Sequence, residues 1–123
     1  MKMTGLSSRI AAFSSPFASA AEELADDISC EVIDPRTLRP LDLDTILESV
    51  RKTNRAVIVE EGWPHGGVGA NLAALIGEQA FDYLDAPIAR VSGADLPMPY
   101  SKPLEQIAFP HEQQIVEKVR SLF

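Results

Sequence analysis

The chain has 123 residues, of which 46% are hydrophobic and 24% charged, and this suits one folded domain with one core. Its 11 basic residues are scattered among 18 acidic ones, and the net charge of −7 disfavours binding to nucleic acid or to an anionic membrane. The single cysteine, Cys30, excludes a disulfide framework within the chain and a cysteine-rich zinc site.

Strand and helix patterns alternate along the chain. The strongest strand pattern is the nearly continuous apolar run at 55–60, which predicts a central strand covered on both faces. Helices are predicted where apolar residues recur three and four positions apart. The expected elements are, in chain order, a strand at 9–14, a helix from Pro16 to about Asp27, a strand at 30–34, a helix from Asp42 to about Thr53, a strand at 55–60, a helix ending near Leu84, a strand at 88–92 and a helix from about Pro110 to Leu122.

This alternation predicts an α/β domain with a mainly parallel sheet and helices on both faces. Between the last strand and the last helix, Gly93–Pro103 contains three prolines and little periodicity, so we expect an ordered surface loop there. Residues 1–8 are expected to be disordered or extraneous to the fold, and residues 9–123 to form the domain.

A glycine cluster at 66–69 follows the central strand and opens a helix. This placement could present backbone N–H groups to a phosphate. However, the cluster has neither the GxGxxG spacing of dinucleotide-binding folds nor the Gly-Lys-Ser/Thr of a P-loop. Glycines also permit tight turns and close packing of a helix on a sheet, and this interpretation is the better supported one.

Glu60 and Glu61 stand at the carboxyl end of the central strand, where open α/β sheets commonly bind ligands. Either could serve as an acid or a base, but adjacent strand residues point to opposite faces and need not interact. A structural or interface role is therefore favoured. The only tryptophan, Trp63, lies in the next loop, where it either anchors an interface or covers the edge of the core.

The two histidines, His65 and His111, show no metal-binding spacing and are interpreted as a loop residue and a helix-end residue. No apolar run approaches the roughly 18–20 residues that span a membrane, and the first residues lack the apolar stretch of a secretory signal. We therefore expect no membrane association. The expected location is the bacterial cytoplasm, or the mitochondrial matrix after processing.

Three motifs in order along the chain resemble the transketolase C-terminal domain family, and within it the beta subunit of the decarboxylating component of pyruvate dehydrogenase. They occupy residues 31–42, residues 59–70 with Gly-Trp-Pro, and residues 81–100 with Leu-Asp-Ala-Pro and Pro-Met-Pro-Tyr. The resemblance covers 9–123. It implies a three-layer α/β/α fold with a five-stranded, mostly parallel mixed sheet. One antiparallel edge strand is expected in that sheet, and it could lie within Gly93–Phe109.

The resemblance also implies an oxidoreductase that converts pyruvate to acetyl-CoA with thiamine diphosphate and magnesium. In that family the cofactor lies between the alpha subunit and the N-terminal domain of the beta subunit. The Gly-Asp-Gly motif for the diphosphate is absent from this chain. The resemblance therefore implies no catalytic, cofactor-binding or metal-binding residue here, no turnover by this chain alone, and a longer parent subunit.

The role implied for such a domain is assembly. Its partners would be the alpha subunit, a second beta subunit and the basic subunit-binding domain of the acetyltransferase core. Asp85 and Phe123 are the implied docking residues. The implied subunit-interface loop comprises Glu60, Glu61, Trp63, His65, Gly66 and Gly67.

Two alternatives stay open at this point. One is the C-terminal domain of a transketolase or a deoxyxylulose-phosphate synthase. The other is a free-standing α/β module that binds an anion at 66–69.

Overall fold

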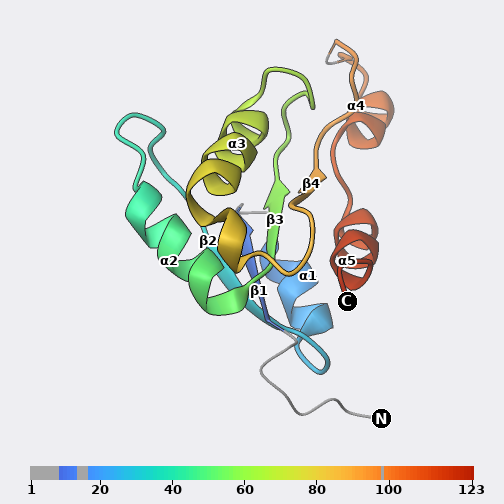
Figure 1. Cartoon of the computed structure of the whole chain (residues 1–123). Coiled ribbons are helices and arrows are strands. Elements are labelled where there is room, and N and C mark those ends of the chain that lie inside the picture. The colour runs from blue at the N-terminus through green and yellow to red at the C-terminus, as the bar shows by residue number, and fades with distance from the viewer. Residues whose placement is uncertain (1–8, 14–16, 98) are drawn as a thin grey trace.

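A computed structural model describes residues 9–13, 17–97 and 99–123, and it places four parallel strands between two layers of helices (Figure 1). The strand order is β2-β1-β3-β4. Residues 1–8 lie outside the described residues, and so does the expectation made for them. The elements are β1 (Arg9–Phe13), α1 (Phe17–Leu24), β2 (Ser29–Ile33), α2 (Leu43–Thr53), β3 (Ala56–Val59), α3 (Val68–Ala80), the 3-10 turn η1 (Phe81–Tyr83), β4 (Ala89–Val91), α4 (Lys102–Ala108) and α5 (Glu112–Arg120).

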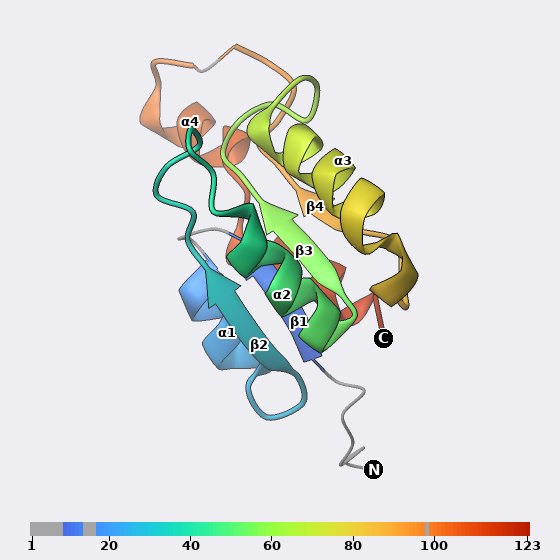
Figure 2. The same ribbon diagram turned by 60° about the vertical axis from the view of Figure 1, so that its left-hand side comes forward.

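The sheet separates two hydrophobic cores, because successive residues of a strand face opposite sides. All four residues of β3 are buried. Val57 and Val59 pack with side chains of α1 and α5 on one face. Ala56 and Ile58 pack with side chains of α2 and α3 on the other. Figure 2 shows the sheet between α2 and α1, and the expected three-layer arrangement is thus confirmed.

The expected fifth strand and its antiparallel edge are not found among the described residues, whose sheet has four strands and parallel pairing throughout. Within the segment where that strand was sought, the chain instead forms the short helix α4. Pro103 stands in the first turn of α4, a position that proline favours because its missing N–H is not needed there. The loop expectation for Gly93–Pro103 holds only as far as Ser101.

The long helix after the glycine cluster ends earlier than its apolar pattern predicts. Regular α-helix stops at Ala80, and the chain tightens into η1 before β4. The turn after α2 accounts for this, because the side-chain amide of Asn54 donates to the carbonyl of Tyr83 at 2.7 Å. The carbonyl of Asn54 also accepts from the N–H of Asp85 at 2.9 Å. These two bonds draw the chain out of the helix.

The helix α2 begins where the sequence predicts. The carboxylate of Asp42 accepts the backbone N–H of Thr45 at 3.2 Å and its hydroxyl at 2.7 Å. This is the geometry of a helix N-cap. The hydroxyl and then the backbone hydrogen bond of Thr45 hold the pKa of the Asp42 carboxyl below its usual range. Asp42 thus fixes the start of α2 and the end of the 34–42 loop.

Parallel pairing gives the sheet two chemically different ends. We call the end where β2, β3 and β4 finish the carboxyl edge, with loops 34–42, 60–67 and 92–101 and helix α4. The opposite end, the amino edge, carries the turns that precede β3 and β4 and the last residues of the chain. In Figure 1 the arrows of β3 and β4 point toward the carboxyl edge, where α4 lies.

Truncating a buried leucine tests the core assignment. Leu24 is fully buried between α1 and the sheet, whereas Leu38 in the 34–42 loop is 55% exposed. We expect Leu24→Ala to lower the free energy of unfolding by about 2–5 kcal/mol. Leu38→Ala should change it by less than about 1 kcal/mol. Urea denaturation followed by circular dichroism measures both, and equal losses would contradict the assignment.

Candidate functional site

A mostly buried carboxylate occupies the carboxyl edge directly after β3. Oε2 of Glu60 accepts the backbone N–H of Gly69 at 2.9 Å, and Oε1 lies 3.3 Å from Nη2 of Arg90. The side chains of Glu60 and Arg90 are 15% and 28% exposed. Both stand at positions that alternate with residues facing α1 and α5, so both turn toward the face of the sheet that α3 covers. The pair therefore joins the ends of two neighbouring strands to the first turn of α3.

The glycine cluster is shaped around this carboxylate. A Cβ atom on Gly69 would collide with the carboxylate of Glu60. A Cβ on Gly67 would lie 2.7 Å from the carbonyl oxygen of Trp63 and 3.1 Å from Oε2 of Glu60. The N–H group that could have received a phosphate at the start of α3 thus binds the chain's own anion. This geometry favours the packing interpretation of the cluster over phosphate binding.

The interface loop of residues 61–67 is tied down at several points. Nη2 of Arg90 donates to the carbonyl of Pro64 at 2.6 Å. The indole N–H of Trp63 donates to the carbonyl of Leu96 at 2.9 Å. The N–H of Gly93 donates to the carbonyl of Gly62 at 2.9 Å. These bonds combine the interface loop and the 92–101 loop into one surface.

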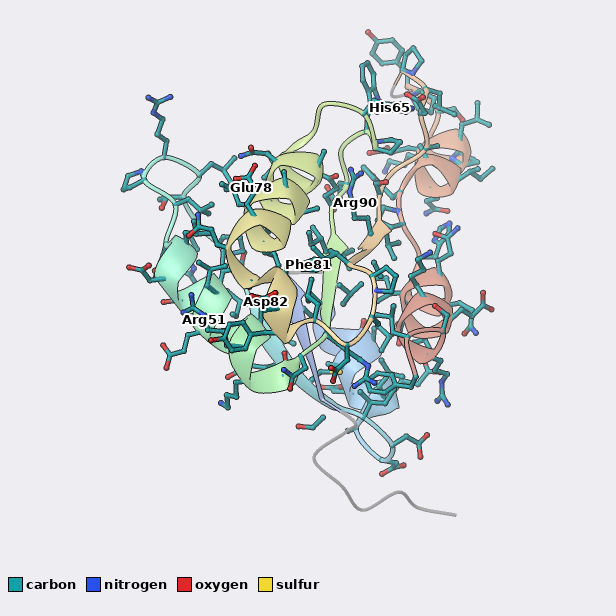
Figure 3. All side chains as sticks on the ribbon, in the orientation of Figure 1. Arg51, His65, Glu78, Phe81, Asp82 and Arg90 are labelled. Carbon is teal, nitrogen blue, oxygen red and sulfur yellow. The ribbon has the colours of Figure 1, made fainter. Side chains whose placement is uncertain are left out.

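His65 and Asp95 form an outer contact between the same two loops. Nε2 of His65 lies 3.4 Å from Oδ2 of Asp95, and the side chains are 84% and 56% exposed. Figure 3 shows His65 at the far end of the loop, well removed from Arg90. Water screens a contact between side chains this exposed, so the contact contributes little to the order of the loop.

Exposed apolar side chains gather on this surface. They come from the interface loop, the 92–101 loop and α4, and the N–H of Ala94 joins the last two by donating to the carbonyl of Ala108 at 2.8 Å. Exposed apolar groups on joined segments at one end of a domain are candidates for an interaction surface. We call this set the carboxyl-edge patch: Trp63, Leu96, Tyr100, Leu104 and Ile107.

An apolar groove of about 240 Å³ lies at the same end of the sheet, between the 34–42 loop and the start of α3. Leu38, which is 55% exposed, lies on one wall, and Val68, which is 48% exposed, lies on the other. The groove adds a further apolar surface at the carboxyl edge, beside the first turns of α3.

The structure sorts the residues of the predicted interface loop into two kinds. Glu61, Trp63, His65 and Gly66 are exposed, as an interface requires, and Gly67 is half-buried. Glu60 points inward and is held by Gly69 and Arg90. Gly66 adopts a φ of 64°, a left-handed conformation that suits a residue without a Cβ.

The two predicted docking residues lie at the amino edge, away from the interface loop. Asp85 is exposed, and its N–H bonds to Asn54. Arg55, which follows Asn54, donates from Nε to the carbonyl of Leu122 at 3.1 Å. Its guanidinium lies 4.4 Å from the ring centre of Phe123. The short turn Asn54–Arg55 therefore anchors both Asp85 and Phe123 to the same end of the sheet.

Sequence reasoning missed Arg90 and the exposed aromatic residues beside Asp85. Phe81, which is labelled in Figure 3, is 71% exposed. Tyr83 is 46% exposed, and the guanidinium of Arg51 lies 5.6 Å from its ring centre. A signal for Arg90 was present, because a charged residue interrupts an otherwise apolar strand. For Tyr83 the helical pattern was misleading, because it predicted this residue on the apolar face of the helix, whereas the side chain is 46% exposed.

The remaining candidate groups have structural explanations. Desolvation by burial raises the pKa of the Cys30 thiol to about 11, so it is protonated at neutral pH. His111 is the N-cap of α5, and its N–H donates to the side chain of Gln114 at 3.0 Å. No group of three His, Cys, Asp or Glu side chains among the described residues could hold a metal ion. In the same part of the chain, no helix is long and apolar enough to cross a membrane.

Comparison with known proteins connects this geometry to one family. Residues 3–115 match the family described as transketolase, C-terminal domain. The pyruvate dehydrogenase E1 component subunit beta of Rickettsia felis is 58% identical over 97 residues, which make up 79% of this chain and 30% of that protein. The mitochondrial subunit of the same name from Dictyostelium discoideum is 55% identical over 102 residues, or 82% of this chain and 29% of that protein.

A solved structure supports the same fold. A chain described as a split gene transketolase, inactive beta4 tetramer, superimposes with a TM-score of 0.71 at 26% identity. The match covers 93% of this chain and 37% of that chain. This chain therefore spans about 30% of the length of the curated relatives and about a third of the solved structure.

Two glycines of the same helix provide a matched test of the Glu60 pocket. Gly69→Ala should lower the free energy of unfolding by about 1–3 kcal/mol, because the new methyl group overlaps the Glu60 carboxylate. Apart from its chain neighbours and the backbone of its own helix, a Cβ on Gly77 would meet no described heavy atom within 4 Å. Gly77→Ala should therefore raise the free energy by about 0.5–1 kcal/mol. Chemical denaturation measures both, and a stabilised Gly69→Ala variant would refute the proposed close fit.

Proposed function

Because this chain belongs to the transketolase C-terminal domain family, we propose that it is the C-terminal assembly domain of a pyruvate dehydrogenase E1 component subunit beta. The supporting observation is identity of 58% to a subunit of that name over 79% of the chain. The identity to the split gene transketolase is 26%. In this proposal the parent enzyme oxidatively decarboxylates pyruvate toward acetyl-CoA, and the present chain alone turns over no substrate.

We propose that the described residues of this chain do not hold the cofactor of such an enzyme. Thiamine diphosphate is bound through magnesium, which needs a group of oxygen ligands. The described residues offer no group of three candidate metal ligands. Glu60, the carboxylate at the ligand-binding end of the central strand, is already bonded to Gly69 and Arg90. We therefore assign no catalytic step to this chain and propose that the cofactor is held elsewhere in the enzyme.

We propose that the carboxyl-edge patch contacts the neighbouring subunits, namely the alpha subunit and a second beta subunit. Its apolar side chains project from a surface that backbone and indole hydrogen bonds hold in place. Tyr100 is fully exposed and Ile107 is 69% exposed, so both would lose water contact on association. Aromatic and large aliphatic side chains on an ordered surface are the usual centre of a protein interface.

The amino edge is proposed to dock the subunit-binding domain of the acetyltransferase core. Asp85 is exposed there, and Asp82 is exposed on η1 immediately before it. The chain carries a net charge of −7, and the resemblance implies a basic docking domain. Opposite charges accelerate encounter and fix orientation. Phe123 adds an apolar ring, 47% exposed, that Arg55 holds in position.

One alternative retains direct structural support. The likeness to the split gene transketolase covers 93% of this chain at 26% identity, and it is the observation behind the alternative of a transketolase or deoxyxylulose-phosphate synthase as the parent enzyme. Turnover of sugar phosphates by the co-expressed partner subunits would support that alternative over the pyruvate enzyme. The free-standing anion-binding module is disfavoured, because Glu60 already fills the glycine cluster and would repel a second anion.

The matched relatives include a bacterial protein and a mitochondrial one. We accordingly propose the bacterial cytoplasm or the mitochondrial matrix as the location of the parent enzyme.

Removing one carboxylate tests the docking proposal. Asp85→Ala should weaken binding of the basic subunit-binding domain about 10- to 100-fold, with the larger effect at low salt. Glu48→Ala removes the same charge from an exposed position on α2 and should leave the affinity within about twofold. Isothermal titration calorimetry at two salt concentrations measures both. Equal affinities for the two variants would remove Asp85 from the docking site.

Replacing one apolar side chain tests the subunit interface. Ile107→Ser should weaken association with the alpha subunit or with a second beta subunit about tenfold or more, because it removes an apolar contact at the patch. Val32→Ser changes a side chain that is 40% exposed on β2, at the far edge of the sheet, and serves as the control. Sedimentation velocity of the reconstituted subunits measures association. The interface assignment fails if the two variants assemble equally well.

A further inference from the structure

We infer that Glu60 and Arg90 are positioning residues, which hold the interface loop in the one conformation that presents Trp63 and His65 to a partner subunit. The inference rests on the proposed assembly role, and it assigns Glu60 a different task from its neighbours in the loop. Glu60 touches no partner. It acts through Gly69 and Arg90, and Arg90 acts through the backbone of Pro64.

The two residues form a relay from the sheet into the loop. The N–H of Glu60 donates to the carbonyl of Val91 at 3.0 Å, which extends the pairing of β3 with β4 by one residue. The position of Glu60 is therefore fixed by the sheet. Its carboxylate then fixes the first turn of α3, where the loop ends, and the guanidinium of Arg90. Arg90 in turn holds the carbonyl of Pro64, in the middle of the loop, at 2.6 Å.

The partly buried guanidinium of Arg90 depends on its bond to Glu60 more strongly than the guanidinium of an exposed arginine would depend on a similar bond. Among the described residues, Nε of Arg90 is buried and has no hydrogen-bond partner. A guanidinium that has lost part of its hydration depends on the bonds that Nη2 makes to Glu60 and Pro64. Removing the carboxylate would leave a poorly solvated cation, which would turn toward water and release Pro64.

Two other bonds of the loop, from the N–H of Gly93 to the Gly62 carbonyl and from the Trp63 indole, tie it to the 92–101 loop and not to a strand. Gly62, Gly66 and Gly67 bring no side chains with which to pack, and they leave the unclamped backbone many accessible conformations. The His65–Asp95 pair is exposed and screened. The link through Arg90 to Pro64 is thus a direct bond from a strand residue to the middle of the loop.

Association with a partner subunit should then depend on Glu60 and Arg90, because they order the interface loop before the partner binds. A loop that is ordered before binding loses less conformational entropy when the partner arrives. Substituting Glu60 or Arg90 would therefore weaken association without removing an atom that contacts the partner. Loss of order should also be visible in the 123-residue chain alone, before any partner is added.

Trp63, the only tryptophan, makes the loop directly observable. We would compare Glu60→Ala, Glu60→Gln and Arg90→Met with the unmodified chain, at a dilution where sedimentation shows a monomer. Acrylamide quenching reports on Trp63, and hydrogen exchange reports on the amides of residues 61–69. Lys52→Met is the matched control, because it breaks an ion pair of 3.0 Å with Glu31 whose side chains are 59% and 39% exposed.

In Glu60→Ala and Arg90→Met, we expect protection of the 61–69 amides to fall about 10- to 100-fold and quenching of Trp63 to rise. Exchange of the β3 amides of Val57–Val59 should stay unchanged. Glu60→Gln should fall between these variants and the unmodified chain, since the amide oxygen still accepts from Gly69 but loses the charge. Lys52→Met should match the unmodified chain.

Unchanged protection at 61–69 in Glu60→Ala and Arg90→Met would overturn the inference. So would a loss of protection that is equal in the loop and in β3, because the pair would then stabilise the whole fold and not the loop. Should either variant unfold, Glu60→Gln carries the same comparison with a smaller perturbation. Equal assembly of the Ile107→Ser and Val32→Ser variants would count against the assembly proposal alone, since loop order is measured without a partner.

Discussion

The burial of β3 on both faces is the constraint on which the rest of the structure depends. Its four residues contribute alternately to the core beneath α1 and α5 and to the core beneath α2 and α3. It also pairs with β1 on one side and β4 on the other. A strand placed in this way has no freedom of register, because a shift by one residue would exchange the side chains of both cores. Glu60 directly follows this strand, so its position at the carboxyl edge is fixed as well.

The parallel sheet separates two tasks that we assign to this domain. Loops that follow the strands meet at the carboxyl edge, where the apolar patch lies. Turns that precede the strands meet at the amino edge, where Asn54 and Arg55 anchor Asp85 and Phe123. One end is apolar and held by hydrogen bonds, while the other combines carboxylates with aromatic rings. A subunit contact and a charged docking contact can therefore be made at the same time without competing for one surface.

The sequence was sufficient to predict the alternation of elements and the parallel sheet, because the apolar run of β3 and the N-cap at Asp42 are local patterns. It was not sufficient where distant contacts decide the outcome. Regular helix ends at Ala80 because Asn54, far along the chain, bonds to Tyr83. The helix α4 escaped notice because proline is read as a helix breaker unless it stands in the first turn.

For the proposed functional surfaces too, local patterns could be predicted from the sequence, whereas contacts between distant residues could not. Family resemblance marked the loop from Glu60 to Gly67 but could not tell which of its residues face outward. That distinction depends on Arg90, which stands thirty residues further along the chain from Glu60 and reaches it only in the folded sheet. The inward turn of Glu60 follows from strand alternation, yet its partner follows only from strand order. The carboxyl-edge patch likewise needs α4 in place.

The outer strands of the sheet have a consequence for how copies of this domain can meet. β4, at one edge, has only three residues. β2, at the other, carries Glu31, whose carboxylate is held by Ser49 at 2.7 Å and by Lys52 at 3.0 Å. Short edges and charged edge residues resist the addition of a further strand, which is the usual route from exposed sheets to fibrous aggregates. The association that we propose at the two ends of the sheet is therefore compatible with edges that resist polymerisation along the sides of the domain.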